Sequence, residues 1–288
     1  MRYLLLSLLI SLLNISAAFA QVDQNKPFPP HKVAGNIYYV GSETLATFLI
    51  ATPQGNILIN SDFEATVPVI RAAVEKLGFK FSDTKILLGS HAHGDHMEGD
   101  ALLKEYTGAQ VMVMEQDVPA LRAMRPGGKE HPIDRILKDG DKVTLGGTTL
   151  TAHLTAGHTK GCTTWSLQTT EAGRTLDVVI VCSVGVNANF LLVNNTDYPQ
   201  IVDDYRKSFA KLRTMKADVF LGAHGAFYGV TEKYAQLEKG GGANPFIDDK
   251  AIGAYVDLKE QEFNTRLLDQ QQGKLPATGK GKAKGKAK

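Results

Sequence analysis

The segment SHAHGDHMEG, residues 90–99, places three histidines, one aspartate and one glutamate within ten positions of a 288-residue chain that has only eight histidines. It begins at the end of KILLGS, an apolar run typical of a buried strand. In extended chain, residues two apart face the same side, so His91 and His93 can converge on one point. The glycine that follows allows a turn, which would direct Asp95 and His96 toward a second point nearby.

Imidazole nitrogens together with a carboxylate oxygen form a ligand set well suited to Zn²⁺. Four such ligands within six residues favour two adjacent metal ions, because sequence neighbours cannot all close on one tetrahedron. Each ion then needs a further ligand from elsewhere. His158 in AGHTKG and His224 in GAHGAF both follow strand-like runs and are flanked by small residues. We interpret His31, His131 and His153, which lack that context, as ordinary core or surface histidines.

Both ends of the chain differ in composition from its body. Residues 1–20 combine a short positive start, an apolar run and Ala-Phe-Ala, which predicts a secretory signal cleaved after Ala20. The apolar run is short for a membrane span, and no later stretch reaches that length. We therefore expect an exported, periplasmic protein without a stable membrane anchor. Residues 273–288, GKLPATGKGKAKGKAK, are predicted to form a basic, low-complexity, disordered tail.

The formal net charge of +2 conceals an acidic body. The first twenty residues and the tail hold seven of the 32 Lys and Arg residues and no Asp or Glu, so residues 21–272 carry a net charge of about −5. Such a body gives no sign of specific nucleic-acid binding. The tail is interpreted as a solvated appendage, with weak contact to anionic lipid or nucleic acid as the alternative.

Only two cysteines are present, Cys162 and Cys182. Both lie in apolar, strand-like stretches. We interpret them as small buried hydrophobic residues and expect no disulfide framework, so that the domain at 21–272 depends on its core for stability.

Strands and helices alternate without a steady βαβ rhythm, which favours mixed sheets covered by helices over a doubly wound parallel sheet. Alternation, apolar periodicity and Gly or Pro punctuation predict strands at 36–41, 47–52, 56–61, 85–90, 111–114, 142–145, 148–154, 165–169, 178–181 and 219–222. They predict helices at 66–77, 98–106, 116–124, 201–215, 231–239 and 248–271.

The His-x-His-x-Asp-His motif, the later GHTKGCTTW and the Gly-flanked His224 together resemble the metallo-β-lactamase superfamily, and are most similar to subclass B3. The similarity runs from PFPPHKVAGNIYYVG at 27–41 through IVDDYRKSF at 201–209 to ANPFID at 243–248. It implies an α/β fold of mixed α+β type, a four-layer αβ/βα sandwich with two facing mixed β-sheets flanked by helices.

The resemblance also implies a site and a reaction. Two zinc ions per chain would be held, the first by His91, His93 and His158 and the second by Asp95, His96 and His224. The implied activity is hydrolysis of the amide bond of a small-molecule β-lactam by zinc-bound hydroxide, which confers β-lactam resistance. These six residues would be the catalytic centre, with Asp95 also orienting the hydroxide.

One stretch departs from several relatives of this fold. Glyoxalase II and the lactonases place a metal-bridging Asp between the two later histidines, whereas VVIVCSVGVN at 178–187 contains no carboxylate. Alignment on the B3 pattern puts Ser183 there, where it would position water or the substrate carboxylate. Cys182 as a zinc ligand, as in subclasses B1 and B2, remains the alternative. Gly185 stands where a second Ser is often found, which weakens the inference about carboxylate binding.

Two other functions remain open at this stage. One is another dinuclear-zinc hydrolase of the same fold, a lactonase or thioesterase. The other is a zinc-binding or surface-binding protein without enzymatic activity. The S-x-x-K match at 208–211 is a chance match, because S-D-N and K-T-G are absent. Loops 41–47 and 125–134 are expected to overhang the site. The sequence sets neither the preferred β-lactam class nor the oligomeric state.

Overall fold

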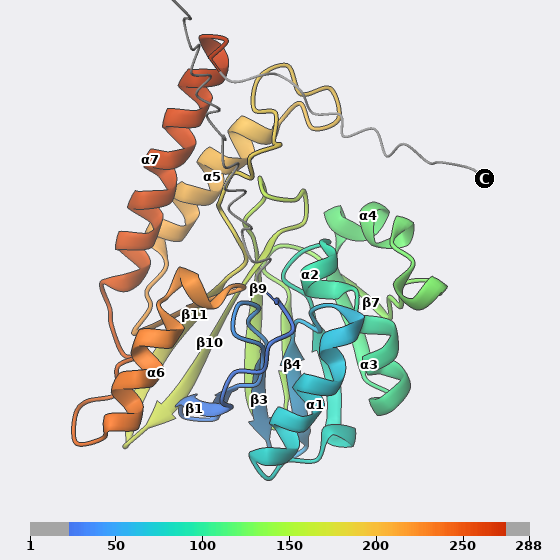
Figure 1. Cartoon of the computed structure of the whole chain (residues 1–288), viewed down its shortest axis with the longest axis vertical. Coiled ribbons are helices and arrows are strands. Elements are labelled where there is room, and N and C mark those ends of the chain that lie inside the picture. Colours follow the sequence, from blue (N-terminus) through green and yellow to red (C-terminus); the bar gives the residue numbers. More distant parts are fainter. Residues whose placement is uncertain (1–22, 275–288) are drawn as a thin grey trace, which may run out of the picture.

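The computed structural model describes residues 23–274. Two β-sheets face each other, and helices cover the outer side of each (Figure 1). The first sheet and its helices are β1 (His31–Ala34), β2 (Ile37–Tyr39), β3 (Phe48–Thr52), β4 (Gly55–Ile59), α1 (Val67–Lys76), β5 (Thr84–Leu88), α2 (Gly94–Met97), α3 (Asp100–Thr107), β6 (Gln110–Met114), α4 (Val118–Ala123) and β7 (Arg135–Leu137). The second sheet and its helices are β8 (Lys142–Leu145), β9 (Thr148–Leu154), β10 (Thr163–Glu171), β11 (Arg174–Val181), α5 (Ile201–Thr214), β12 (Val219–Gly222), α6 (Val230–Lys239) and α7 (Ala251–Gln271).

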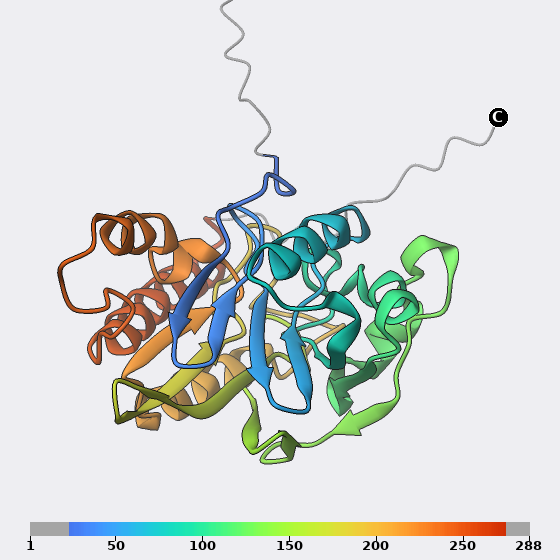
Figure 2. The same ribbon diagram turned by 90° about the horizontal axis from the view of Figure 1, so that it is seen from below.

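Each sheet mixes parallel and antiparallel strand pairs. The seven-stranded sheet has the order β1-β2-β3-β4-β5-β6-β7, antiparallel up to β4 and parallel from β4 to β7. The five-stranded sheet has the order β12-β11-β10-β9-β8, and only β11 and β12 are parallel. Figure 2 shows the two halves side by side, each with its own helices. The predicted sandwich of two mixed sheets flanked by helices is confirmed.

The first sheet is buried on both faces, which explains its continuous apolar strands. Ile57 and Ile59 point into the core between the sheets, whereas Leu58 points to the layer of helices outside. Because side chains alternate along a strand, such a sheet needs apolar residues at nearly every central position. The runs ILI and ILL in β4 and β5 follow from this.

The core between the sheets also fixes the edge at which the histidine cluster lies. Trp165 on β10 is fully buried, and its Nε1 donates a hydrogen bond to the Gly89 carbonyl at 3.1 Å. Gly89 directly precedes the segment of the cluster. Thr163 adds a backbone bond from its N–H to the Ser90 carbonyl at 2.8 Å. The second sheet is therefore bonded to the loop that leaves the first.

Ten strands and six helices of the sequence prediction appear in the structure, with shifted ends. Strands β1 and β7, at the two edges of the first sheet, were not predicted. The helix expected at 98–106 is also different, because a separate short helix, α2, begins at Gly94 and precedes α3. That extra turn lies within the histidine motif.

The expectation that no disulfide forms is wrong. Cys162 and Cys182 are bonded to each other, with their Cα atoms 5.8 Å apart. The hairpin of β10 and β11 pairs Trp165 with Ile180, which brings the residues just outside both strands close together. Both cysteines are fully buried, as expected. The two cysteines are 20 residues apart in the sequence, and the register of β10 and β11 brings them close enough to bond. Composition alone does not reveal that register.

We predict that replacing both cysteines by Ala lowers the free energy of unfolding by about 3 kcal/mol, since a closed loop of this length constrains the unfolded chain by roughly that amount. Urea denaturation of the double variant and of the wild type measures the difference. Detection of two free thiols in the unreduced, denatured wild type would contradict the disulfide.

The predictions for the two chain ends concern residues that lie almost entirely outside the described range. The signal peptide at 1–20 is not described, and of the tail only Gly273 and Lys274 are. Both remain predictions, as do the domain bounds 21–272. Within residues 23–274, no helix is long and apolar enough to cross a membrane.

The three histidines interpreted as ordinary make contacts outside the six-residue motif. His31 stacks on Tyr39 with ring centroids 5.4 Å apart. His153 on β9 contacts the Ser166 hydroxyl at 2.7 Å. His131 is buried, with its Nε2 3.1 Å from a carboxylate oxygen of Asp100.

His131 makes stability depend on pH. Burial opposes its charge, but the hydrogen bond and the negative charge of Asp100 outweigh that and raise the pKa of His131. A raised folded-state pKa means that protonation favours folding. This contribution is fully present below the unfolded pKa of about 6.5 and is lost as the pH rises through the folded-state pKa.

We therefore predict that His131→Gln destabilises the protein most at low pH. The difference in free energy of unfolding between wild type and variant should shrink as the pH rises above the unfolded-state pKa of about 6.5 and through the raised folded-state pKa. Urea denaturation across that range measures it. A difference that stays constant, or that grows with pH, would contradict the ion pair.

Candidate metal centre

Six side chains from both sheets meet at one edge of the sandwich. His91, His93, Asp95 and His96 follow β5, in the loop that leads into α2 and in α2 itself. His158 lies in the connection between β9 and β10, and His224 comes two residues after β12. These are the six residues predicted as metal ligands, and the structure divides them into the two predicted triplets.

The first triplet consists of His91, His93 and His158, whose candidate ligand atoms all lie within 4.8 Å of one another. Their ring centroids are 4.7–4.9 Å apart in each pairing. His91 and His93 lie in a bend rather than in extended strand, and the His93 N–H bonds the His91 carbonyl at 2.8 Å. The two imidazoles nevertheless converge as the spacing predicted.

The second triplet consists of Asp95, His96 and His224. The Nε2 atoms of the two histidines are 3.2 Å apart. One Asp95 carboxylate oxygen lies 3.4 Å from His96 Nε2 and 3.8 Å from His224 Nε2. Asp95 and His224 are about a quarter exposed, whereas His96 is fully buried, so this triplet opens toward solvent on one side.

The protein keeps these imidazoles neutral. Burial, reinforced by neighbouring histidines, holds the pKa values of His91 and His96 well below their ordinary value. Burial also lowers the pKa of His158 to about 4. Burial lowers the pKa of His93 and His224 as well, against the opposing charge of Asp95. Neutral imidazole has a free lone pair, which a metal ligand requires.

The orientation of the rings fits a bound cation. His158 Nδ1 contacts the Gly185 carbonyl at 2.8 Å, which directs its other nitrogen into the triplet. His91 Nδ1 faces the Ser90 hydroxyl at 3.1 Å, while its Nε2 is buried without a hydrogen-bond partner. A buried polar atom left unpaired is costly. A cation held between the three nitrogens would satisfy it.

Cys182 is not a metal ligand, because its sulfur is bonded to Cys162 and offers no thiolate. The Cys182 sulfur lies 3.5 Å from His91 Nδ1, so the disulfide packs against the first triplet. Ser183 is buried beside it, and its Oγ accepts a hydrogen bond from the Gly185 N–H at 3.3 Å. Its role in substrate binding stays a prediction.

One of the two loops expected near the site contacts it. In loop 41–47, the Ala46 N–H donates to the Ala223 carbonyl at 3.0 Å, and Leu45 forms a β-bridge with His224. Loop 125–134 instead contacts the segment after the motif through His131, whose Nε2 lies 3.2 Å from the Met97 carbonyl.

Sequence reasoning missed two features beside the cluster. The segment after Ser183 brings the Phe190 ring to a centroid distance of 5.4 Å from that of His158. Asp117 accepts hydrogen bonds from both loops that supply the first triplet. A single acidic residue between a strand and a helix gave no signal, because its partners, two backbone N–H groups and the Thr159 hydroxyl, lie far away in the sequence.

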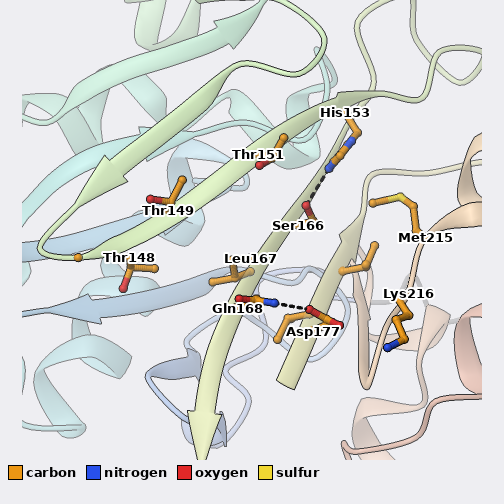
Figure 3. Close-up of a pocket in the computed structure, with 13 residues that line it drawn as sticks. Thr148, Thr149, Thr151, His153, Ser166, Leu167, Gln168, Asp177, Met215 and Lys216 are labelled. Carbon is orange, nitrogen blue, oxygen red and sulfur yellow. Dashed lines mark hydrogen bonds between the residues drawn. The ribbon is translucent and has the colours of Figure 1, made fainter. Parts of the chain in front are cut away.

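A separate cavity of about 540 Å³ lies on the face of the second sheet opposite the core (Figure 3). Its lining includes Thr149, Thr151, His153, Ser166 and Gln168. None of the six clustered residues takes part in it. His153 is therefore a suitable control histidine for experiments on the metal centre.

Comparison with known proteins agrees with the fold and the site. The family model described as "Metallo-beta-lactamase superfamily" matches residues 45–224, more than half of the chain. The chain belongs to the metallo-β-lactamase superfamily. It is similar to the structure of the native FEZ-1 metallo-β-lactamase from Legionella gormanii, with 47% identity, 85% of this chain and 98% of that one covered, and a TM-score of 0.82.

The other relatives include a second metallo-β-lactamase and a hydrolase with a different name. BJP-1, a subclass B3 metallo-β-lactamase of Bradyrhizobium japonicum, is 39% identical over 87% of this chain and 97% of its own, with a TM-score of 0.81. A hydroxyacylglutathione hydrolase of Cereibacter sphaeroides is 37% identical over 33% of this chain. The chain spans only about a third of the length of that curated relative, 32%.

We predict that each triplet binds one divalent ion on its own. His91→Ala and His224→Ala should each reduce the bound zinc by one ion per chain, whereas His153→Ala should leave it unchanged. Metal analysis after equilibrium dialysis measures the stoichiometry, and circular dichroism controls for folding. Unchanged stoichiometry in a folded His91→Ala or His224→Ala variant would remove that residue from the ligand set.

Proposed function

We propose that the protein is an exported, zinc-dependent β-lactamase that hydrolyses the β-lactam amide bond and confers β-lactam resistance. The observation that carries the proposal is the pair of three-residue ligand clusters at one sheet edge, one of three imidazoles and one with a single carboxylate. The structural relatives named as metallo-β-lactamases, including one of subclass B3, support it.

Zinc suits these ligands because imidazole nitrogen and carboxylate oxygen are its usual partners. We assign one ion to His91, His93 and His158, and another to Asp95, His96 and His224. Two ions bound there would supply Lewis acidity and lower the pKa of water to about 7, so that hydroxide is available near neutral pH.

The side chains of the protein supply binding and orientation. The three neutral imidazoles of the first triplet contribute no charge, so Asp95 is the one anionic group among the six ligands. We assign Asp95 the task of orienting the attacking water as well as ligation. Water adds across the amide bond, with oxygen bonding to the carbonyl carbon while the C–N bond breaks and the nitrogen gains a proton. No protein side chain forms a covalent bond to the substrate.

The S-x-x-K segment plays no part in this reaction. Ser208 is buried in α5, and its hydroxyl donates to the Ala156 carbonyl at 2.7 Å. Lys211 pairs with Asp139 instead of facing the serine. Both side chains are engaged in packing and surface contacts, which supports a mechanism without a serine nucleophile.

The first test is hydrolysis of a carbapenem and a cephalosporin by the purified protein, before and after removal of metal with EDTA. We expect chelation to abolish turnover and added zinc to restore it. His91→Ala should lower kcat/KM by at least about 100-fold, since even residues that only orient a metal ligand contribute 10–100-fold. His153→Ala should retain wild-type activity. Turnover that persists in the fully demetallated protein would contradict the proposal.

The alternative is another dinuclear-zinc hydrolase of this fold, acting on a thioester or lactone. It is motivated by the relatives named hydroxyacylglutathione hydrolase. Between 178 and 187 the chain has no carboxylate, and Asp95 is the only acid in either triplet within the described residues. The lack of an Asp that could bridge the two metal ions, as in glyoxalase II and the lactonases, favours the β-lactamase. A protein that binds two zinc ions, hydrolyses a hydroxyacylglutathione thioester and leaves β-lactams intact would decide for the alternative.

Export is tested separately. Cell fractionation should place the protein in the periplasm, and the mature N-terminus should be Gln21. A protein that retains residues 1–20 in the cytoplasm would contradict the export part of the proposal without affecting the chemistry.

A further inference from the structure

Resting on the proposed zinc-binding function, we propose that Asp117 is a positioning residue for the first metal ion, holding together the two loops that carry His91, His93 and His158. Asp117 is the last residue of a short 3₁₀ turn, Glu115–Asp117, that follows β6. It is 3% exposed and belongs to neither ligand triplet.

Asp117 bonds the loop that follows β5. Its Oδ2 accepts a hydrogen bond from the Ala92 N–H at 2.9 Å. Ala92 lies between His91 and His93, so this bond fixes the backbone from which both imidazoles extend.

The same carboxylate bonds the loop between β9 and β10. Oδ2 also accepts from the Thr159 hydroxyl at 2.8 Å, and Oδ1 accepts from the Gly161 N–H at 2.7 Å. Thr159 is the neighbour of His158. One side chain therefore connects loops from two different sheets, and the three ligands of the first triplet lie on those two loops.

The close approach of Gly161 to Asp117 supports a specific contact between them. A Cβ atom added there would lie 2.5 Å from the Asp117 nitrogen and 2.6 Å from its Cγ. Real side chains do not tolerate such distances, so any residue larger than glycine would push Asp117 away from the loop. Position 161 thus requires glycine because there is no space for a side chain, and not because the backbone adopts a conformation that only glycine favours.

The charge of Asp117 complements the first triplet. Three neutral imidazoles leave a divalent cation without an anionic ligand, whereas the second triplet has Asp95. Asp117 places a buried carboxylate one contact behind the first set. Groups that orient metal ligands without binding the metal themselves typically contribute 10–100-fold to metal affinity.

The fold does not depend on Asp117 alone at this junction. The Thr163 N–H bonds the Ser90 carbonyl at 2.8 Å, and the Cys162–Cys182 disulfide closes the end of the hairpin. We therefore expect a substitution at Asp117 to leave the two sheets in place and to alter mainly the alignment of the two loops.

The test is Asp117→Asn, which keeps size but removes the charge and one acceptor. Whichever way the amide turns, its NH₂ group faces a backbone N–H, of Ala92 in one orientation and of Gly161 in the other. The affinity of the metal-free protein for zinc at the first triplet should fall about 10–100-fold, with little change at the second. Competition against a chromophoric chelator measures both, and spectra of the cobalt-substituted protein report ligand geometry.

Further variants sharpen the assignment. His91→Ala identifies the first triplet by removing it. Gly161→Ala should weaken the same ion as Asp117→Asn, and the double variant should lose less than the combined effects because both break one contact. Asp218→Asn is the matched control, since Asp218 accepts the Asp177 N–H at 2.9 Å in the second sheet, away from both ligand loops.

Unchanged zinc affinity in a folded Asp117→Asn protein would overturn the inference. So would equal weakening of both ions in step with a lower free energy of unfolding, because that pattern indicates a general structural role. These measurements use zinc and cobalt without substrate. They therefore decide the role of Asp117 even if β-lactam hydrolysis fails.

Discussion

The six proposed metal ligands can converge only if loops from two sheets are held in a fixed relation, and the rest of the structure depends on that constraint. Three of the imidazoles belong to residues at most 9% exposed, and their ring centroids lie within 5 Å of their neighbours. Neutral rings packed this way leave lone pairs facing one another. The shared core between the sheets, with Trp165 bonded to the loop after β5, keeps these rings together.

The two triplets differ in charge, and that difference shapes the chemistry available to each. The first is neutral, with His91 and His158 buried and His93 partly buried, which suits a Lewis acid that polarises a carbonyl group. The second includes a carboxylate and is partly open to solvent, which suits delivery and orientation of water. The two triplets lie next to each other, because the ring centroids of His91 and His96 are only 4.2 Å apart. This arrangement is compatible with the proposed hydrolysis without a covalent intermediate.

Much of this could be predicted from the sequence because its signals are local. The spacing of His91, His93 and Asp95 is written within five residues, and the apolar strands of a sheet buried on both faces are continuous. The disulfide could not be predicted, since it depends on the register of β10 and β11. The short edge strands β1 and β7 are specified by their neighbours more than by their own residues. Asp117 escaped notice because its backbone partners lie 25 and 44 residues away.

The ligand triplets set the reaction type but do not choose the substrate, because amides, thioesters and lactones all present a carbonyl carbon to water. Choice must come from groups that contact the substrate away from the bond that breaks. The segment with Phe190 lies against His158 at the site. Gln270 on α7 holds it there: its Oε1 accepts the Leu192 N–H at 2.7 Å and its Nε2 donates to the Phe190 carbonyl at 2.7 Å. Helix α7 thus bonds, through Gln270, the segment whose Phe190 lies against His158. Under the proposed function, a helix that contributes no ligand would help to form the wall beside which the substrate binds.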